Sequence, residues 1–184
     1  AINDERFIRR SEILWEKGTN RSEFFRGEVN KYGWVDTGSS FLPSEVIAAF
    51  LWAQLENMNT IQKRRKDIWN LYYEGLESLE KLGLFRLPEI PSYATNNAHM
   101  FYLVCRNLNE RTQLIKHLKD NGVLAVFHYL SLHLSEYYTQ NNEEIPNLPE
   151  CDRYADCLVR LPLYYELKDE EVKHIIELIK KFYI

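Results

Sequence analysis

The residues of this chain that could bind a phosphate group stand just before a long apolar helix. The sequence Asp36-Thr37-Gly38-Ser39-Ser40-Phe41 offers two adjacent hydroxyls, those of Ser39 and Ser40, and several backbone amides. Phosphate sites are commonly built in this way, because a helix N-terminus has unpaired N–H donors and a favourable dipole. The same residue types also form ordinary helix caps. The local sequence therefore leaves a phosphate site and a simple cap both open.

A second group of polar residues follows a predicted strand at 123–127. His128 and His133 flank Tyr129 in the sequence HYLSLH. Two imidazoles and a phenol at a strand end could hold the phosphate or hydroxyl groups of a ligand, although a surface turn would have the same composition. The two histidines are five residues apart and have no cysteine or carboxylate set beside them in the sequence, so no metal site is predicted.

Familiar catalytic motifs do not occur in the chain. It contains no P-loop, no nucleophile elbow and no dinucleotide-binding glycine fingerprint. Its three cysteines, Cys105, Cys151 and Cys157, are odd in number and form no CxxC pair, which favours a reducing, cytoplasmic compartment.

The composition of the 184 residues is that of an ordinary globular protein, with 45% hydrophobic and 27% charged residues. The net charge of −4 argues against a nucleic-acid-binding surface, which usually needs clustered basic residues. No apolar run approaches the length of a membrane span, so no membrane partner is expected.

The first third of the chain predicts a helix at 4–16, a long glycine-punctuated loop at 17–43 and a helix for which Ser44 is a suitable N-cap. From Val46 to Ala53 this helix is apolar nearly all round, which predicts burial on every side. The pattern then becomes one-sided as far as Leu82. We therefore expect a domain boundary near residue 55, dividing the chain into 1–55 and 56–184.

The remaining chain alternates predicted strands and helices. Apolar runs predict strands at 98–105, 123–127 and 160–163, and helices at 111–120, 151–159 and 169–181. Alternation of this kind predicts a small α/β layer in which helices pack on a short sheet.

Five segments in a fixed order carry a family resemblance: GTNRSEFFRGEVNKYGW, DTGSSFLPSEVIAAFLWAQLE, NNAHMFYLV, VFHYLSLH and LVRLPLYYEL. Together they resemble the C-terminal part of the DegT/DnrJ/EryC1/StrS sugar aminotransferases, and are most similar to the TDP-4-oxo-6-deoxy-D-glucose transaminases. The resemblance implies the C-terminal part of a fold-type I transferase that depends on pyridoxal 5′-phosphate (PLP). Residues 1–55 would end the large PLP domain and carry a cross-dimer loop, and residues 56–184 would form the linking helix and the small α/β domain.

The resemblance also implies an activity. The full-length enzyme would be a homodimer that moves an amino group, from a donor such as glutamate, onto the 4-keto carbon of a dTDP-linked 6-deoxyhexose. The product would serve surface polysaccharide biosynthesis, of the lipopolysaccharide or common-antigen type. The Schiff-base lysine of the family lies upstream of the segment that matches Ala1. No residue of this chain is therefore assigned a catalytic role, and the isolated chain is expected to be inactive. It is also expected to expose the apolar helix at 46–53, which the large domain would cover.

Two other readings stay open. Some members of the family use PLP for sugar dehydration, with histidine in place of the Schiff-base lysine, and the deciding residue lies outside this chain. Alternatively, the chain could be a stand-alone, non-catalytic sugar-nucleotide-binding or interaction domain.

The resemblance implies ligand contacts for seven residues. Ser39 and Ser40 would contact the PLP phosphate, while Leu42 stands where relatives have an arginine. The diphosphate or sugar of the substrate would be contacted by Lys17, Asn20 and Arg21. The sugar nucleotide would also face the imidazoles of His128 and His133. Ser131 stands where the family commonly has proline, which implies a less rigid loop.

Overall fold

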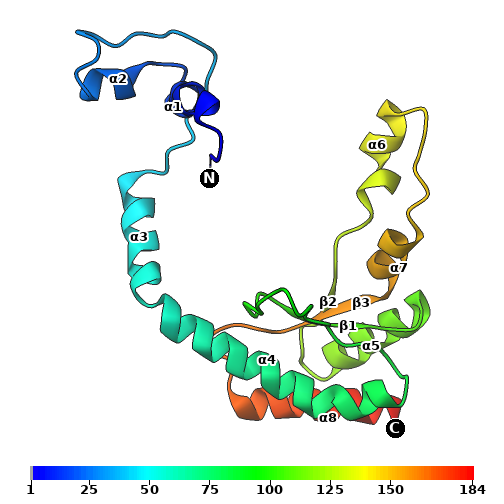
Figure 1. The fold of residues 1–184 in the computed structure, drawn as a ribbon. Helices are drawn as coiled ribbons and strands as arrows, with labels where there is room; N and C mark the ends of the chain where they lie inside the picture. Colours follow the sequence, from blue (N-terminus) through cyan, green and yellow to red (C-terminus); the bar gives the residue numbers. More distant parts are fainter. Residues whose placement is uncertain (1) are drawn as a thin grey trace. The chain divides into compact units, whose positions relative to one another are not determined.

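The computed structural model describes residues 2–184, and their contacts divide the chain into two compact units (Figure 1). The N-terminal unit ends at Asn57, and the C-terminal unit spans Met58–Ile184.

The N-terminal unit consists of short helices joined by an ordered loop. Its elements are η1 (Glu5–Phe7), α1 (Ile8–Trp15), α2 (Arg21–Phe25) and α3 (Glu45–Glu56). The sequence predicted the first and last helical regions but not α2, because a five-residue helix is too short to show a period. Ion pairs tie the segments together: Arg26 contacts Glu12 at 2.9 Å and Glu28 at 2.6 Å.

Helix α3 begins where the sequence predicted it but is not buried. Ser44 is its N-cap, and its Oγ accepts a hydrogen bond from the Ile47 amide at 3.4 Å. The burial that its apolar pattern predicts is not supplied within residues 2–184, since Val46 is 79% exposed and Phe50 70% exposed; this agrees with the expectation that the chain by itself exposes this helix. A helix that is apolar on all sides requires other parts of a protein to pack around it. Within residues 2–184 no residue of α3 is buried, so this packing is not supplied by the described chain.

The C-terminal unit is a three-stranded sheet with the helices at 58–81, 108–120 and 169–183 packed on one face (Figure 1). Its strands, β1 (Phe101–Val104), β2 (Val126–Phe127) and β3 (Leu158–Leu161), are antiparallel in the order β1-β3-β2. The helices of this unit are α4 (Met58–Lys81), α5 (Leu108–Asp120), α6 (Glu136–Asn141), α7 (Pro149–Cys157) and α8 (Asp169–Tyr183), and η2 spans Leu132–Leu134.

These elements confirm the α/β fold class and correct several boundaries. The predicted strand at 160–163 lies two residues earlier, because α7 begins at Pro149 and ends at Cys157 rather than running to Val159. The strand predicted at 123–127 is reduced to Val126–Phe127. Short apolar runs identify a strand better than they fix its ends, since buried turns next to the strand are equally apolar.

The core of the C-terminal unit lies between the sheet and helices α4, α5 and α8. Alternate strand residues face it, and the one-sided stripe of α4 packs on α8. Gly75 makes the close approach of these helices possible, because a Cβ there would lie 2.6 Å from Cδ1 of Ile176. The largest fully buried side chains are Tyr72, Phe101, Ile68, Leu76 and Leu79.

One core residue allows a test of this packing. Tyr72 is fully buried, and its hydroxyl donates to the carbonyl of Pro162 at 3.0 Å. Tyr72→Phe leaves that carbonyl without its donor, so we expect a loss of about 1–2 kcal/mol in the free energy of unfolding. Tyr73→Phe is the matched control, because Tyr73 is half-buried and stacks on Trp69 without a hydroxyl hydrogen bond in residues 2–184. Urea unfolding of both variants measures the difference; equal losses would contradict the assignment.

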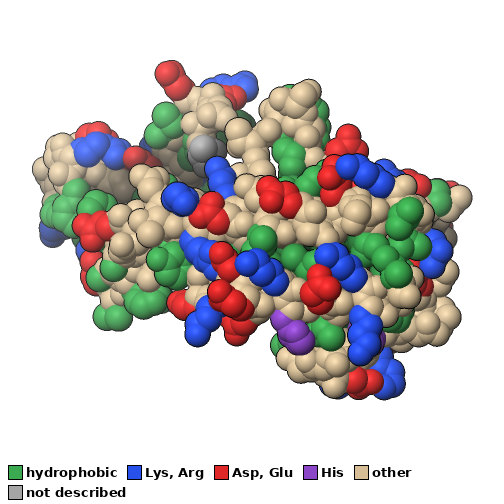
Figure 2. All heavy atoms as spheres, turned by 90° about the horizontal axis from the view of Figure 1, so that it is seen from below, with side chains coloured by type: hydrophobic (Ala, Val, Ile, Leu, Met, Phe, Trp, Pro, Cys, Tyr) green, Lys and Arg blue, Asp and Glu red, His purple; other side chains and the backbone are tan. Residues whose placement is uncertain are grey.

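The outer surface of α4 and α8 carries charges of both signs in alternation (Figure 2). Ion pairs along the helices account for much of it, including Lys63 with Asp67, Lys81 with Glu77, and Arg64 with Asp169, at 2.7–2.9 Å. Within the part of the chain that the structure describes, no helix combines the length and the apolar character needed to cross a membrane.

Candidate functional site

In the N-terminal unit, backbone hydrogen bonds lock the Lys17–Gly18 turn to the segment 35–39. The amide of Lys17 donates to the Ser39 carbonyl at 3.2 Å, and the amide of Ser39 donates to the Leu14 carbonyl at 3.0 Å. The Gly18 carbonyl accepts from the amides of residues 35 and 36 at 2.8 and 3.0 Å. Both turn residues have left-handed backbones, with φ values of 60° and 77°. The serine segment is therefore held in place by the chain before it.

Ser39 and Ser40 present free hydroxyls on this fixed backbone. Both residues are exposed, and neither hydroxyl has a hydrogen-bond partner within residues 2–184. Ser40 also pairs with Glu16 in an isolated antiparallel bridge. A fixed backbone with two unused hydroxyls suits an oxyanion ligand such as a phosphate group. The role of these serines in cofactor binding stays a prediction.

The three residues predicted to bind the substrate in this unit differ in how many of their side-chain donors already have a partner within the chain. Both ends of the Asn20 amide make a hydrogen bond, since Nδ2 donates to Glu23 at 3.2 Å and Oδ1 accepts from the Gly33 amide at 2.8 Å. Arg21 donates to Glu16 at 3.1 Å, and its guanidinium lies over the rings of Phe25 and Tyr32. Asn20 thus holds the loop, whereas only part of the Arg21 fork is occupied.

Lys17 is the most accessible of the three. Its side chain is 62% exposed, and its ammonium lies 3.7 Å from the Glu16 carboxylate, a loose contact in water. This ammonium can therefore turn towards an anionic ligand at little cost.

In the C-terminal unit, His128 and His133 line one hollow of about 600 Å³. Tyr138, Cys151 and Tyr154 contribute to the same walls. The structure thus brings together the two histidines that the sequence singled out. They differ in burial: His128 is half-buried, and His133 is only 6% exposed.

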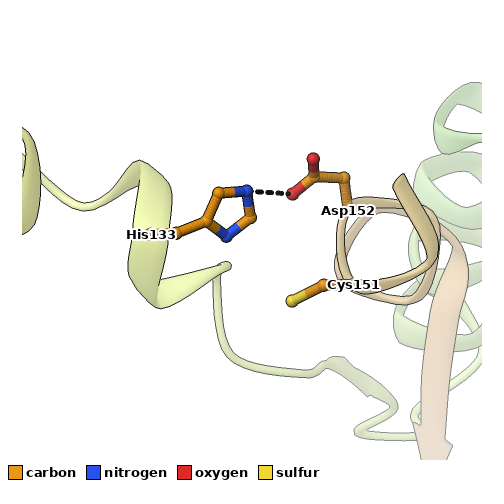
Figure 3. A group of neighbouring side chains, drawn as sticks. All are labelled: His133, Cys151 and Asp152. Carbon is orange, nitrogen blue, oxygen red and sulfur yellow. Dashed lines mark ion pairs between the residues drawn. The ribbon is translucent and has the colours of Figure 1, made fainter. Parts of the chain in front are cut away.

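His133 belongs to a cluster with Cys151 and Asp152 of α7 (Figure 3). Its Nε2 lies 3.4 Å from Oδ1 of Asp152. The buried hydroxyl of Ser131 donates to the same oxygen at 2.6 Å. This carboxylate therefore ties two points of the loop, Ser131 and His133, to α7.

The cluster also resembles a zinc site in two respects. Histidine, cysteine and aspartate are zinc ligands, and the three ligand atoms lie within 4.8 Å of one another. Cys151 Sγ lies 3.5 Å from the Ser131 hydroxyl, so the polar groups already contact one another. Hydrogen bonding accounts for the arrangement without a metal. The sequence could not have revealed it, because Asp152 lies 19 positions after His133 and no spacing rule connects the two.

Comparison with known proteins decides what kind of protein carries these sites. The model of the DegT/DnrJ/EryC1/StrS aminotransferase family matches residues 1–180. The chain belongs to this family. Family membership confirms the resemblance seen in the sequence, and PLP is the cofactor of the family.

Three relatives illustrate the match. The dTDP-3-amino-3,4,6-trideoxy-alpha-D-glucose transaminase of Streptomyces venezuelae is 24% identical over 157 residues, which are 85% of this chain and 40% of that protein. The aminotransferase TlmJ of Streptoalloteichus hindustanus shares the fold with a TM-score of 0.83 at 22% identity, over 100% of this chain and 46% of that one. The PLP form of the putative sugar aminotransferase Spr1654 of Streptococcus pneumoniae matches with a TM-score of 0.80 at 24% identity, over 98% and 44%. The chain thus spans less than half the length of these relatives.

Proposed function

We propose that this chain is the C-terminal portion of a PLP-dependent sugar-nucleotide aminotransferase. The observation that carries the proposal is the family match over residues 1–180, together with relatives that are sugar aminotransferases. The full-length enzyme would aminate the 4-keto group of a dTDP-linked 6-deoxyhexose, with glutamate as a donor. The product would enter surface polysaccharide biosynthesis of the lipopolysaccharide or common-antigen type, and the enzyme would act in the cytoplasm.

The cofactor contacts proposed for this chain are the hydroxyls of Ser39 and Ser40. Both are exposed and unpartnered within residues 2–184, which is what a phosphate ligand requires of its donors. When bound, PLP would supply the electron sink needed to move an amino group. The role of this chain is to hold the phosphate end in place, because the backbone bonds of Lys17 and Ser39 fix the serine segment.

Two of the substrate contacts proposed in this chain are cationic. Lys17 and the unoccupied part of the Arg21 fork would hold the diphosphate, since guanidinium groups bind phosphate oxygens in pairs. His128, half-buried at the wall of its hollow, would face the sugar nucleotide. His133, buried against Asp152, would act through the position of the loop.

The apolar surface of α3 supports a further part of the proposal. Its exposed side chains would be covered by the large domain or by the second subunit of a homodimer, because exposed apolar patches of this kind mark interfaces. The isolated chain would accordingly self-associate and have no transaminase activity. Light scattering that shows a monomer at high concentration would contradict the first statement.

The activity is tested on the complete reading frame. We expect the purified protein to bind PLP, with a visible absorbance band that glutamate bleaches and a dTDP-4-keto-6-deoxyhexose restores. Mass spectrometry should show the amino sugar as product. A deoxygenated keto sugar without amine uptake would identify the dehydratase instead, and a protein that neither binds PLP nor changes the sugar would support a non-catalytic binding domain.

The cofactor contact has its own test. In the complete protein, replacement of both Ser39 and Ser40 by alanine removes two donors to a charged group, so we expect the Kd for PLP to rise about tenfold or more. Ser22→Ala is the matched control, because its hydroxyl has no partner in residues 2–184 and lies on α2. Equilibrium dialysis measures the affinity; equal Kd values for all three proteins would contradict the assignment.

A further inference from the structure

Arg160 occupies the middle of the sheet in the C-terminal unit. It lies on the central strand β3, where it pairs with Tyr102 of β1 and Val126 of β2. Side chains alternate between the two faces of a strand. The neighbours of Arg160 along β3, Val159 and Leu161, belong to the core, so Arg160 lies on the sheet face that points away from that core.

The side chain of Arg160 is half-buried and has no partner. Its Nε is buried without a hydrogen-bond acceptor, and no carboxylate pairs with its guanidinium within residues 2–184. The other half-buried arginines each donate to a carbonyl or a carboxylate; these are Arg64, Arg65, Arg111 and Arg153. A guanidinium group has donors only, and burial of an unpaired charged donor is costly. Arg160 is thus arranged for an acceptor outside the described chain.

One polar group lies directly opposite Arg160 in the sheet, and another follows the strand on its other side. Tyr102, its cross-strand neighbour, is half-buried, and burial raises the pKa of its hydroxyl, so the phenol stays protonated and can donate. His128 follows β2 two residues after Val126, and its Nδ1 is also buried without a partner. Two of the three unpartnered buried polar side-chain atoms in residues 2–184 therefore belong to Arg160 and His128.

We propose that Arg160, with Tyr102 opposite it and His128 two residues beyond its partner Val126, binds an oxyanion of a substrate. This inference rests on the proposed function and adds a residue that neither the sequence motifs nor the comparisons single out. The planar fork of arginine matches the paired oxygens of a carboxylate or a phosphate. In an aminotransferase of this kind the oxyanion has two sources, the carboxylate of the amino donor and the diphosphate of the sugar nucleotide.

Affinity measurements on the complete protein test the site and separate the two sources. The probes are L-glutamate and thymidine 5′-diphosphate, each titrated by calorimetry into the protein freed of PLP, so that no reaction accompanies binding. The variants are Arg160→Gln and Arg160→Lys. Arg153→Gln on α7 is the matched control, because that guanidinium is already paired with Glu150 at 2.7 Å.

We expect Arg160→Gln to raise the Kd of one probe about tenfold or more, and Arg160→Lys to raise it less, since lysine keeps the charge but loses the fork. Loss of glutamate affinity would assign the donor carboxylate, and loss of thymidine diphosphate affinity would assign the diphosphate. Unchanged affinity for both probes in folded variants would overturn the proposal.

One additional measurement keeps the result interpretable. If Arg160→Gln fails to fold, the Nε–H resonance of Arg160 in the unaltered protein serves instead: the bound probe should shift it, and no shift with either probe would overturn the site. Failure of this proposal can be told apart from failure of the proposed function, because the two are measured separately. Amine transfer is measured as activity, whereas the dependence of probe binding on Arg160 is measured as affinity.

Discussion

Gly18→Ala should disrupt the loop that carries Ser39 and Ser40, with a loss of at least about 3 kcal/mol in its local stability. Gly18 is buried with φ of 77°, a left-handed conformation that costs an alanine about 1–2 kcal/mol. In addition, the new Cβ would overlap the backbone carbonyl oxygen of Asp36. Backbone atoms cannot rotate aside as a side chain can, so the paired segments must separate.

Gly27 provides the matched control for this prediction. It has the same φ of 77°, but a Cβ there would meet no atom within 4 Å. Gly27→Ala should therefore lose only about 1–2 kcal/mol, the cost of the left-handed backbone. Hydrogen exchange at the amides of Val35 and Asp36, which both donate to the Gly18 carbonyl, reports the local stability. Similar exchange rates in the two variants would show that crowding at Asp36 has no effect.

Asp152→Ala should release the loop that contains both histidines. The substitution removes the shared acceptor of Ser131 and His133, two side chains that are 7% and 6% exposed. Buried polar groups left without a partner cost roughly 1–3 kcal/mol. We therefore expect the amides of Leu134 and Ser135, whose hydrogen bonds close the turn, to exchange about thirtyfold faster, which corresponds to about 2 kcal/mol.

Asp156→Ala is the control for the released loop. Asp156 is exposed on the same helix, and its carboxylate has no hydrogen bond in residues 2–184, although its carbonyl accepts from Arg111. Unchanged amide hydrogen exchange at Leu134 and Ser135 in Asp152→Ala would show that Asp152 does not hold the loop on α7. Protection that requires added zinc and disappears in Cys151→Ser would show instead that the cluster is a metal site.

Much of the fold was accessible from the sequence because its elements have clear periods. The one-sided stripe of α4 and the cap at Ser44 were predicted and are present. The sequence failed where burial depends on a partner rather than on a period. Helix α3 is apolar all round, which predicts that other residues cover it. The pattern does not identify those residues, and the described part of the chain does not supply them.

The candidate sites were accessible only in part, for a related reason. The sequence predicted Ser39, Ser40 and the two histidines as ligand-binding residues, because they are polar and adjoin a predicted helix or strand. Arg160 did not, since one arginine in a strand of four residues has no distinguishing pattern. Its importance depends on which face of the sheet it occupies and on the absence of a partner, and both are properties of the folded chain.

The apolar surface of α3 has a consequence for the life of the protein in the cell. Burial of a large apolar side chain is worth about 1.5–3 kcal/mol, and six such side chains on α3 are at least half exposed: Val46, Ile47, Phe50, Leu51, Trp52 and Leu55. Any polypeptide in which α3 has lost its cover, through truncation or failed assembly, would offer chaperones and proteases a continuous hydrophobic helix to recognise. In the proposed full-length enzyme, the surface that joins α3 to its cover would thus also mark incomplete copies for removal.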